Sequence, residues 1–299
     1  MICFPNAKIN VGLHVLSKRE DGYHNLETLL YPIGLKDALE IIPAQTGDTE
    51  QGKSMETIQV ETMRAMGTST TKGYRLYQTG LPLKGAAEEN LVIKALRQVK
   101  EKREIPPIDI HLLKKIPSGA GLGGGSSDGA FMLRLLNDTF KLHFPEEELT
   151  RMAATLGADA PFFIGNRPAL ATGIGDQLEP IDLNLSGYFL LLVKPNIEIS
   201  TIAAYSMVTP ATPEVSIREI VRQPVSNWEK VLKNDFEPSI FKRYPAIARI
   251  KQRLYDMGAL YASMSGSGSS VYAIFEEKLK EPAWRESFPD CFTWCSQPL

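Results

Sequence analysis

The first residues of the chain alternate between apolar and polar positions. From residue 9 to residue 15 the odd positions are aliphatic, and the even positions from residue 8 are polar or glycine: Lys8, Asn10, Gly12 and His14. A period of two residues predicts a strand, because successive side chains of a strand point to opposite faces. One face of this strand is therefore predicted to belong to the core, and the other to be wet or functional.

Further periodic segments predict both helices and strands. Aliphatic residues at intervals of three and four predict helices over residues 90–100, 145–156 and 247–257. Shorter apolar or alternating runs predict strands over 26–33, 38–42, 108–112, 188–193, 260–264 and 271–275. Residues 46–74 are polar and weakly patterned, which predicts irregular or edge structure with a possible strand over 57–62. Because strands and helices mix without strict alternation or repeats, the predicted fold class is α+β.

The most unusual segment follows the strand predicted at 108–112 and precedes an apolar run at 130–136. Over residues 117–128 it reads Pro-Ser-Gly-Ala-Gly-Leu-Gly-Gly-Gly-Ser-Ser-Asp, with five glycines within seven positions. Glycines cost backbone entropy, but they permit main-chain N–H groups to approach a ligand closely. Ser127 or Asp128 is predicted to be the N-cap of the next helix, whose free N–H groups attract an anion. A chain of phosphates is the simplest ligand, and a flexible linker is the alternative.

Three known motifs compete for this segment. A Walker A loop requires a lysine after its glycines, and this loop has serine there. The spacing Gly-x-Gly-x-x-Gly over residues 119–124 satisfies the dinucleotide fingerprint, but no βαβ pattern surrounds it. Residues 125–129 match the Gly-x-Ser-x-Gly elbow of serine hydrolases, with Ser127 as the nucleophile. A long glycine loop separates that serine from the preceding strand, so a hydrolase is the remote alternative.

Two further turns, over residues 171–176 and 265–270, are also rich in glycine and small polar residues. Each of them alone is explained by a hairpin between two strands. Together with the loop at 117–128 they could converge on one polyanionic ligand, and both interpretations stay open.

The composition excludes several classes of protein. The chain has 299 residues, with 33 Lys and Arg against 35 Asp and Glu, a formal net charge of −2. A dedicated nucleic-acid-binding protein usually has a strong basic excess, so no nucleic-acid partner is expected. No apolar run approaches the ~20 residues that span a bilayer, and no secretory signal pattern is visible, so no membrane partner is expected. Three cysteines without a disulfide or zinc pattern are typical of a cytoplasmic protein.

These motifs carry a specific resemblance. Residues 117–127 resemble the phosphate-binding loop of the GHMP kinases, and residues 264–269 resemble the C-terminal Gly-rich motif of that superfamily. Four further blocks resemble one branch of this superfamily, the kinases that act on a cytidine-diphosphate-linked methylerythritol. These blocks are residues 7–10, 18–29, 156–163 and 234–237. The matches follow in order along the sequence, so the resemblance covers essentially the whole chain.

The resemblance implies a two-domain α+β fold with the active site in the cleft between the domains. Residues 1–165 would form an ATP-binding domain that resembles ribosomal protein S5 domain 2, and residues 166–299 a ferredoxin-like domain on the substrate side. The implied reaction is ATP-dependent phosphorylation of the 2-hydroxyl of the cytidine-diphosphate-linked methylerythritol, in the non-mevalonate isoprenoid pathway, with ATP and Mg²⁺ as cofactors. A GHMP kinase for another small alcohol, such as homoserine or mevalonate, is the nearer alternative.

Two residues are candidates for the transfer chemistry. A secondary alcohol must lose its proton as the new P–O bond forms, so a carboxylate within hydrogen-bonding reach is the natural base. Asp159 follows the helix end predicted at Gly157 and is predicted to be this base, with a capping role as the alternative. Lys8 is predicted to lie beside it, where its charge would keep the carboxylate ionised and stabilise the developing alkoxide.

The remaining candidate residues divide by ligand. Tyr23 is expected to stack on the pyrimidine, and His24 to hydrogen-bond its polar edge. By resemblance, Tyr205 closes the aromatic sandwich, and further substrate contacts come from Asn10, Thr201 and Gly266. For ATP the resemblance implies Asn90, Leu91 and Lys114 near the adenine. The phosphates would be held by Pro117, Ser118, Gly119, Ala120, Gly121, Leu122, Gly123, Gly124, Gly125, Ser126 and Ser127. Ser126 and Ser127 could reach magnesium, but no metal ligand is assigned.

Overall fold

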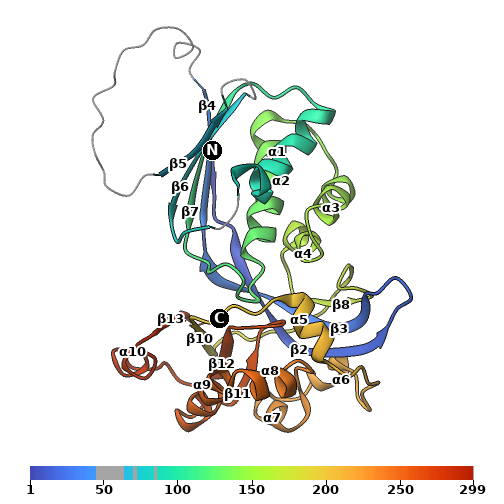
Figure 1. Cartoon of the computed structure of the whole chain (residues 1–299), viewed down its shortest axis with the longest axis vertical. Coiled ribbons are helices and arrows are strands. Elements are labelled where there is room, and N and C mark those ends of the chain that lie inside the picture. Colours follow the sequence, from blue (N-terminus) through green and yellow to red (C-terminus); the bar gives the residue numbers. More distant parts are fainter. Residues whose placement is uncertain (45–63, 70–72, 84–85, 299) are drawn as a thin grey trace. The chain divides into compact units, whose positions relative to one another are not determined.

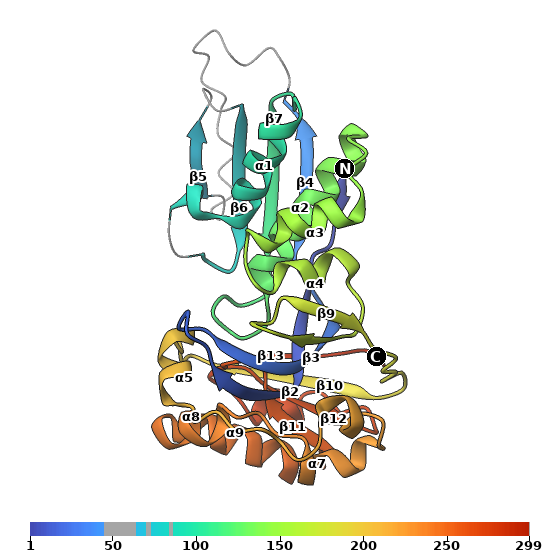
Figure 2. The same ribbon diagram turned by 90° about the vertical axis from the view of Figure 1, so that its right-hand side faces the viewer.

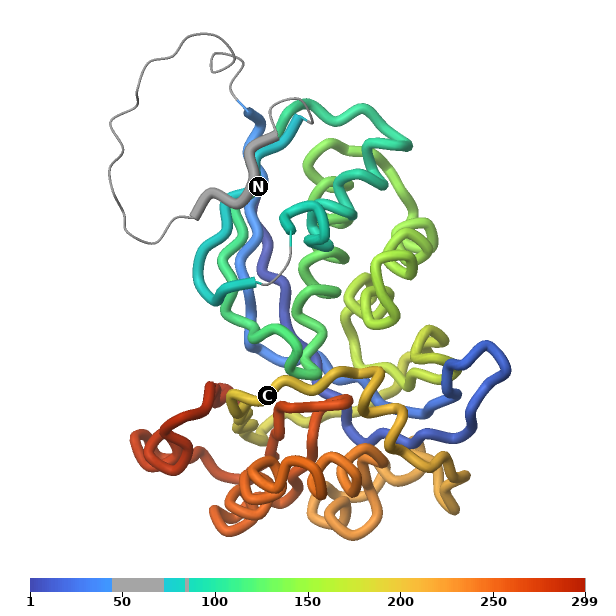
Figure 3. Tube along the Cα trace, viewed as in Figure 1, coloured from blue at the N-terminus to red at the C-terminus, as the bar shows by residue number. Residues whose placement is uncertain are grey.

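The computed structural model describes residues 1–44, 64–69, 73–83 and 86–298 (Figure 1). The chain divides into two compact units, and Figure 3 shows how each draws on several stretches of sequence. Unit 1 comprises Met1–Asn6, Lys36–Ile116 and Gly124–Ile164, and unit 2 comprises Ala7–Leu35, Pro117–Gly123 and Gly165–Leu299. The predicted division into 1–165 and 166–299 stays a prediction.

Unit 1 is a five-stranded sheet with helices over one face (Figure 2). Its strand order is β1-β4-β7-β6-β5, in which β6 and β7 are parallel and the other neighbours are antiparallel. The strands are β1 (Ile2–Cys3), β4 (Ala38–Pro43), β5 (Arg64–Ser69), β6 (Tyr74–Gly80) and β7 (Ile108–Lys114). The helices are α1 (Leu91–Lys102), α2 (Gly124–Phe140), α3 (Glu146–Ala154) and α4 (Ala160–Gly165), with a 3₁₀ turn over Ala87–Glu89.

Alternation along the strands and periodicity along the helices account for the core of unit 1. Ile108, Ile110 and Leu112 of β7 are buried, and so are Leu96 and Val99 of α1. The predicted helix at 90–100 and strand at 108–112 are therefore confirmed. The helix predicted over 145–156 is α3, which ends two residues earlier than expected.

Unit 2 contains two four-stranded sheets, with strand orders β2-β3-β8-β9 and β11-β12-β10-β13. The first consists of β2 (Asn6–Lys18), β3 (His24–Lys36), β8 (Ala169–Thr172) and β9 (Gln177–Pro180). The second consists of β10 (Phe189–Pro195), β11 (Tyr261–Met264), β12 (Val271–Phe275) and β13 (Cys291–Cys295). The helices are α5 (Thr201–Met207), α6 (Ile217–Ile220), α7 (Trp228–Val231), α8 (Glu237–Arg243), α9 (Pro245–Asp256) and α10 (Ala283–Glu286), with a 3₁₀ turn over Val225–Asn227.

The helix predicted over 247–257 is confirmed as α9, which packs on β11 and β12. Its buried residues Ile247, Ile250 and Leu254 join one apolar cluster with Met264 and Val271 of the two strands. Side chains at intervals of three and four lie on one face of a helix, so these aliphatic residues of α9 all pack on the sheet. The sheet thereby holds the turn between β11 and β12 on a rigid base.

The expectation that Ser127 or Asp128 caps the helix after the glycine loop is wrong. α2 begins at Gly124, so both residues lie inside its first turns and are buried. Gly124 packs so closely on Ile116 that a Cβ placed on it would lie 2.7 Å from a side-chain methyl carbon. The Asp128 carboxylate turns inward to Lys114, 2.6 Å from its Nζ, and does not bind the helix's free N–H groups.

The polar face of the first strand is buried, and not wet as one alternative expected. Lys8, Asn10 and His14 of β2 are only 3%, 4% and 6% exposed. Buried polar groups of this kind require hydrogen-bond partners. Their presence on one strand face therefore favours the other alternative, a functional face.

The segment 46–74 is described only in part. Residues 64–69 form β5 at the edge of the unit 1 sheet, as expected for edge structure. The possible strand over 57–62 lies outside the described residues. In the part of the chain that the structure describes, no helix is both long and apolar enough to cross a membrane.

Candidate active site

In unit 2 the first part of the glycine loop is fixed between β2 and the turn that joins β11 to β12. The Lys8 amide donates to the Leu122 carbonyl (3.0 Å), and the Ser265 hydroxyl donates to the Gly121 carbonyl (2.8 Å). Gly121 has a φ of +75°, and a Cβ there would lie only 2.0 Å from the Ser265 carbonyl oxygen. Two glycine-rich segments that are far apart in sequence therefore meet at these residues.

Lys8 and Asn10 form a buried network with this turn. Lys8 Nζ donates to Asn10 Oδ1 (2.6 Å), and Asn10 Nδ2 donates to the Thr28 hydroxyl (3.0 Å). The Asn10 amide donates to the Ser265 hydroxyl oxygen (3.2 Å), and the Thr28 hydroxyl donates to the Gly12 carbonyl (2.6 Å). A buried ammonium is costly unless it is hydrogen-bonded. Asn10 therefore fixes the Lys8 charge beside the glycine loop.

The aromatic candidates Tyr23 and His24 lie at the start of β3, and Tyr205 lies in α5. The His24 and Tyr205 rings stack with centroids 5.0 Å apart and planes 21° apart. Tyr23, the residue before His24, is 61% exposed. Thr201 Oγ1 lies 3.4 Å from the hydroxyl of Ser267, which neighbours Gly266. Unit 2 thus brings His24 to Tyr205, and Thr201 to the C-terminal glycine turn.

In unit 1 the candidates gather around the start of α2. Asn90 is the N-cap of α1, and its side chain accepts a hydrogen bond from the Val92 amide (3.0 Å). Leu91 packs on the glycine run, since a Cβ placed on Gly125 would lie 3.8 Å from Leu91 Cδ1.

The loop that carries Asp159 approaches the same turn of α2. A Cβ on Gly157 would lie 3.4 Å from the Ser126 hydroxyl, and half-buried Asp159 follows two residues later, directly before α4. The first N–H groups of α2 have no partner within the helix, so they suit an anion.

In unit 1, Lys114 lies in a buried cluster with two carboxylates. Its Nζ binds Asp37, in the link between β3 and β4, and lies 2.6 Å from Asp128 Oδ2. The three side chains are 2%, 0% and 3% exposed. Asp37 also accepts hydrogen bonds from the amides of Lys115 and Ile116. These contacts join the end of β7 to the first turns of α2, on both sides of the glycine loop.

This placement changes the role that we assign to Lys114. The sequence predicts a contact to ATP, but the ammonium is buried between Asp37 and Asp128. Its contacts favour a part in holding the ends of the loop and not in touching the nucleotide.

Burial in this cluster raises the pKa of the Asp128 carboxyl to about 8; the Lys114 ammonium opposes the rise and the Asp37 carboxylate adds to it. An unfolded Asp loses its proton near pH 4. Between about pH 4 and about pH 8 the folded state therefore binds more protons than the unfolded state. The stability that the proton confers is present below that window and is lost as the pH rises through it.

We expect the free energy of unfolding to fall between pH 5 and pH 8, by at most about 1.4 kcal/mol per pH unit from this group. Asp128→Asn removes the titration and should flatten this part of the profile. Chemical unfolding of both proteins at several pH values measures the difference. Equal slopes for the two proteins would contradict the assignment.

The glycines of the loop offer a matched pair of substitutions. Gly119 and Gly121 both have positive φ, +60° and +75°, so alanine costs similar backbone strain of about 1–2 kcal/mol at each. Of the two, the new Cβ collides at Gly121, whereas at Gly119 no atom of the described residues lies within 4 Å of it. For ATP, the ligand that the sequence predicts for this loop, we expect Gly121→Ala to reduce kcat/KM at least about tenfold more than Gly119→Ala, since small displacements of a binding loop are costly. Equal losses in steady-state kinetics would show that the collision is harmless.

The hydrolase alternative is wrong. Ser127 lies within α2 and is 0% exposed, and its hydroxyl has no hydrogen-bond partner among the described residues. A nucleophile elbow exposes its serine on a sharp turn between a strand and a helix. Ser127 is therefore closed off from any acyl substrate.

Lys8 and Asp159 belong to different units, so their predicted pairing stays a prediction. Asp37, Thr28 and Ser265 were not predicted as site residues. Thr28 and Ser265 lie within the blocks 18–29 and 264–269, and Asp37 lies in no motif. Their individual contacts could not be predicted, because their partners are separated from them by many residues of sequence.

Comparisons with known proteins agree with these features. Residues 90–167 match the family described as GHMP kinases N terminal domain, and residues 216–290 match GHMP kinases C terminal. A curated relative, a 4-diphosphocytidyl-2-C-methyl-D-erythritol kinase of Parabacteroides distasonis, is 54% identical and covers 99% of this chain and 99% of its own. A kinase of the same name from Bacteroides fragilis is 49% identical over 98% of each chain.

Solved structures show the same relationship. A crystal structure of a 4-(cytidine 5'-diphospho)-2C-methyl-D-erythritol kinase has a TM-score of 0.78 and 29% identity, and covers 99% of this chain and 98% of that chain. A homoserine kinase from Cytophaga hutchinsonii has a TM-score of 0.63 at 17% identity, over 98% and 94% of the two chains. The second likeness shows a shared fold alone.

Proposed function

Because this chain belongs to the GHMP kinases, and within them to the family of 4-diphosphocytidyl-2-C-methyl-D-erythritol kinases, we propose that it phosphorylates the 2-hydroxyl of that compound with ATP. This reaction is a step of the non-mevalonate isoprenoid pathway. The observation that carries the proposal is the identity of 54% over 99% of both chains. The hydrogen bond between the two glycine-rich segments, from the Ser265 hydroxyl to the Gly121 carbonyl, also supports the proposal.

Phosphoryl transfer depends mainly on positioning and on neutralising charge. In our proposal the glycine loop and the first N–H groups of α2 hold the phosphates of ATP. Asn90 and Leu91, which lie beside that turn, border the adenine. Among the described residues no group of three or more His, Cys, Asp or Glu side chains is placed to hold a metal ion. Mg²⁺, which would neutralise phosphate charge, is therefore assigned to the phosphates of ATP, with Ser126 near them.

The acceptor hydroxyl must lose a proton during the transfer. Asp159 is assigned as the base that accepts it, because it lies two residues after Gly157, which approaches the Ser126 hydroxyl in the first turn of α2. Lys8 is assigned to stabilise the negative charge on the acceptor oxygen, and Asn10 holds its ammonium for that task.

The cytidine end of the substrate is assigned to the aromatic residues of unit 2. Tyr23 offers an exposed ring, and the His24–Tyr205 pair offers a ring face and a polar edge. Thr201 lies 3.4 Å from the hydroxyl of Ser267, the residue after Gly266, and Thr201 and Gly266 are assigned to further polar contacts. A kinase for another small alcohol would not require the aromatic set.

An ADP-release assay tests this function. The protein is incubated with ATP, Mg²⁺ and either 4-diphosphocytidyl-2-C-methyl-D-erythritol, homoserine or mevalonate. We expect ADP only with the cytidine compound. Turnover of homoserine or mevalonate with none of the cytidine compound would replace the proposal with the other kinase class.

A further inference from the structure

We infer that the segment Asn234–Phe236 positions both ends of the substrate site: Asn234 fixes the C-terminal glycine turn, and Phe236 fixes the aromatic pair. This inference rests on the proposed function. The segment belongs to a sequence block, residues 234–237, that carries none of the assigned ligand contacts. Every contact used below lies within unit 2.

Asn234 is 1% exposed, and both its amide hydrogens and its oxygen are engaged. Its Nδ2 donates to the carbonyls of Met264 (2.8 Å) and Gly266 (2.9 Å), and its Oδ1 accepts from the Phe236 amide (3.0 Å). Two converging carbonyls can be satisfied only by a group with two donors. A carboxylate of the same size would place an oxygen against both carbonyls, so the site specifies an amide.

The two carbonyls lie on either side of Ser265. That serine donates to the Gly121 carbonyl and accepts from the Asn10 amide. Gly266 has a φ of +56°, and a Cβ on it would lie 3.2 Å from Asn10 Oδ1. By holding the residues before and after Ser265, Asn234 sets the distance between the turn, the glycine loop and the strand that carries Lys8.

Phe236 performs the corresponding task at the aromatic end. Its ring is 1% exposed and meets Tyr205 edge-on, with centroids 4.9 Å apart and planes at 89°. Tyr205 in turn stacks on His24. An edge-to-face contact of this kind prefers one orientation, so Phe236 fixes the plane of Tyr205.

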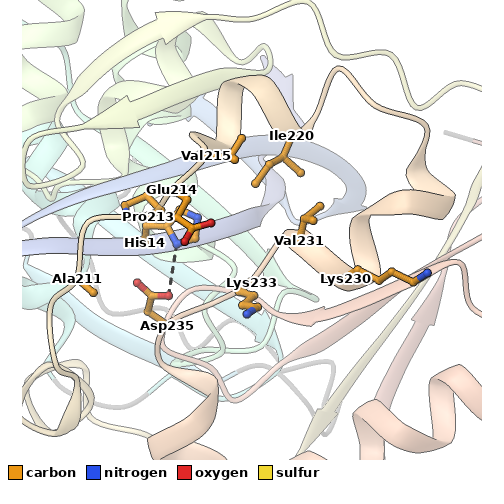
Figure 4. A pocket seen from close by; sticks show the side chains of 10 residues that line it. All are labelled: His14, Ala211, Pro213, Glu214, Val215, Ile220, Lys230, Val231, Lys233 and Asp235. Carbon is orange, nitrogen blue, oxygen red and sulfur yellow. Dashed lines mark hydrogen bonds and ion pairs between the residues drawn. The ribbon is translucent and has the colours of Figure 1, made fainter.

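The segment Asn234–Phe236 and the residue before it are held to β2 by hydrogen bonds. The Leu13 amide donates to the Lys233 carbonyl and the Asp235 amide donates to the Leu13 carbonyl, each at 2.9 Å. Asp235 Oδ2 accepts from the Val15 amide (2.8 Å), and its Oδ1 lies 3.4 Å from His14 Nδ1. Figure 4 shows this His14–Asp235 pair at a cavity of about 450 Å³, whose lining includes neither Asn234 nor Phe236. These hydrogen bonds therefore fix the position of Asn234–Phe236 relative to β2, the strand that carries Lys8 and Asn10.

Two variants separate the two tasks in steady-state kinetics with ATP and the cytidine substrate varied in turn. Asn234→Asp is expected to lower kcat by about 10- to 100-fold, because misplacing binding groups slows transfer. Phe236→Leu is expected to raise KM for the cytidine substrate by about 3- to 10-fold, with kcat and KM for ATP unchanged. Asn227→Asp, the same change at an exposed position of unit 2, is the control and should match the wild type.

Ser265→Ala tests the same link without altering the buried amide, and remains informative if Asn234→Asp does not fold. Alone it should lower kcat about tenfold. Combined with Asn234→Asp it should add little, because the two residues act as one unit. Multiplicative losses, or a normal kcat in Ser265→Ala, would overturn the role of Asn234. Equal changes of kcat and both KM values in Phe236→Leu, in proportion to a lowered melting temperature, would overturn that of Phe236.

The wild-type protein separates failure of this inference from failure of the proposed function. If the wild type turns over a different alcohol, the proposed function is wrong. The Asn234 and Ser265 variants are then measured with that alcohol, since they act on the glycine turn. The Phe236 prediction fails with the function, because it requires the cytidine group.

Discussion

Asp159→Asn is expected to lower kcat by about 10³ and to leave the free energy of unfolding close to that of the wild type. Asparagine keeps the size of the side chain but cannot accept the proton of the attacking hydroxyl, and general-base catalysis contributes about 10²–10⁴ to such rates. The side chain is half-buried directly before α4, and because asparagine has nearly the same size, the replacement creates no cavity. ADP release at saturating substrates measures kcat, and thermal unfolding measures stability.

Asp182→Asn provides the control for this substitution, because Asp182 is exposed and lies in unit 2 outside the candidate residues. It should retain wild-type turnover. A kcat within about threefold of wild type in Asp159→Asn would remove Asp159 as the base. A loss of folding in place of a loss of turnover would favour the capping role.

Lys8→Met is expected to lower kcat by about 10²–10³, the usual effect of removing one group that stabilises a developing negative charge. Methionine keeps most of the apolar stem, and the main losses are the ammonium and its hydrogen bond to Asn10 Oδ1 (2.6 Å). Without Lys8 that oxygen keeps only the weak contact of the Ser265 hydroxyl at 3.5 Å, and the loss costs about 1–3 kcal/mol of stability, which a folded protein of this size tolerates.

A double variant shows whether Lys8 and Asp159 serve the same step. Residues that act as a unit give losses well below the product of the single losses. We therefore expect Lys8→Met with Asp159→Asn to be little worse than Asp159→Asn alone. Lys94→Met, at an exposed position of α1, is the control and should be silent. Fully multiplicative losses would show that Lys8 acts elsewhere in the reaction.

The elements that could be predicted are those with a local signal. Alternation over 7–15 identified β2, and intervals of three and four identified α9, because burial of one face imposes those periods. The start of α2 could not be predicted from capping residues. Its position is set by the contact of Gly124 with Ile116 and by the inward turn of Asp128 to Lys114, and both contacts depend on tertiary structure.

The candidate site divides in the same way. The glycine loop, the turn at Ser265 and Lys8 have short motifs that sequence can show, and the meeting of the first two is confirmed in unit 2. Asp37 is 77 residues from Lys114 and lies in no motif, so its part in the buried cluster appears only in the structure. A motif lysine can equally bind a ligand or neutralise buried carboxylates, and burial decides between them. The net charge of the chain gave no indication that Lys8 and Lys114 are buried.

The position of the new phosphate tests the central claim most directly. The protein is incubated with ATP, Mg²⁺ and 4-diphosphocytidyl-2-C-methyl-D-erythritol, and the product is followed by ³¹P NMR together with the ADP formed. We predict one new phosphomonoester on the 2-hydroxyl of the methylerythritol, in equal amount to ADP, with the cytidine diphosphate intact. ADP formed without that phosphomonoester, or a phosphate on another oxygen, would contradict the account.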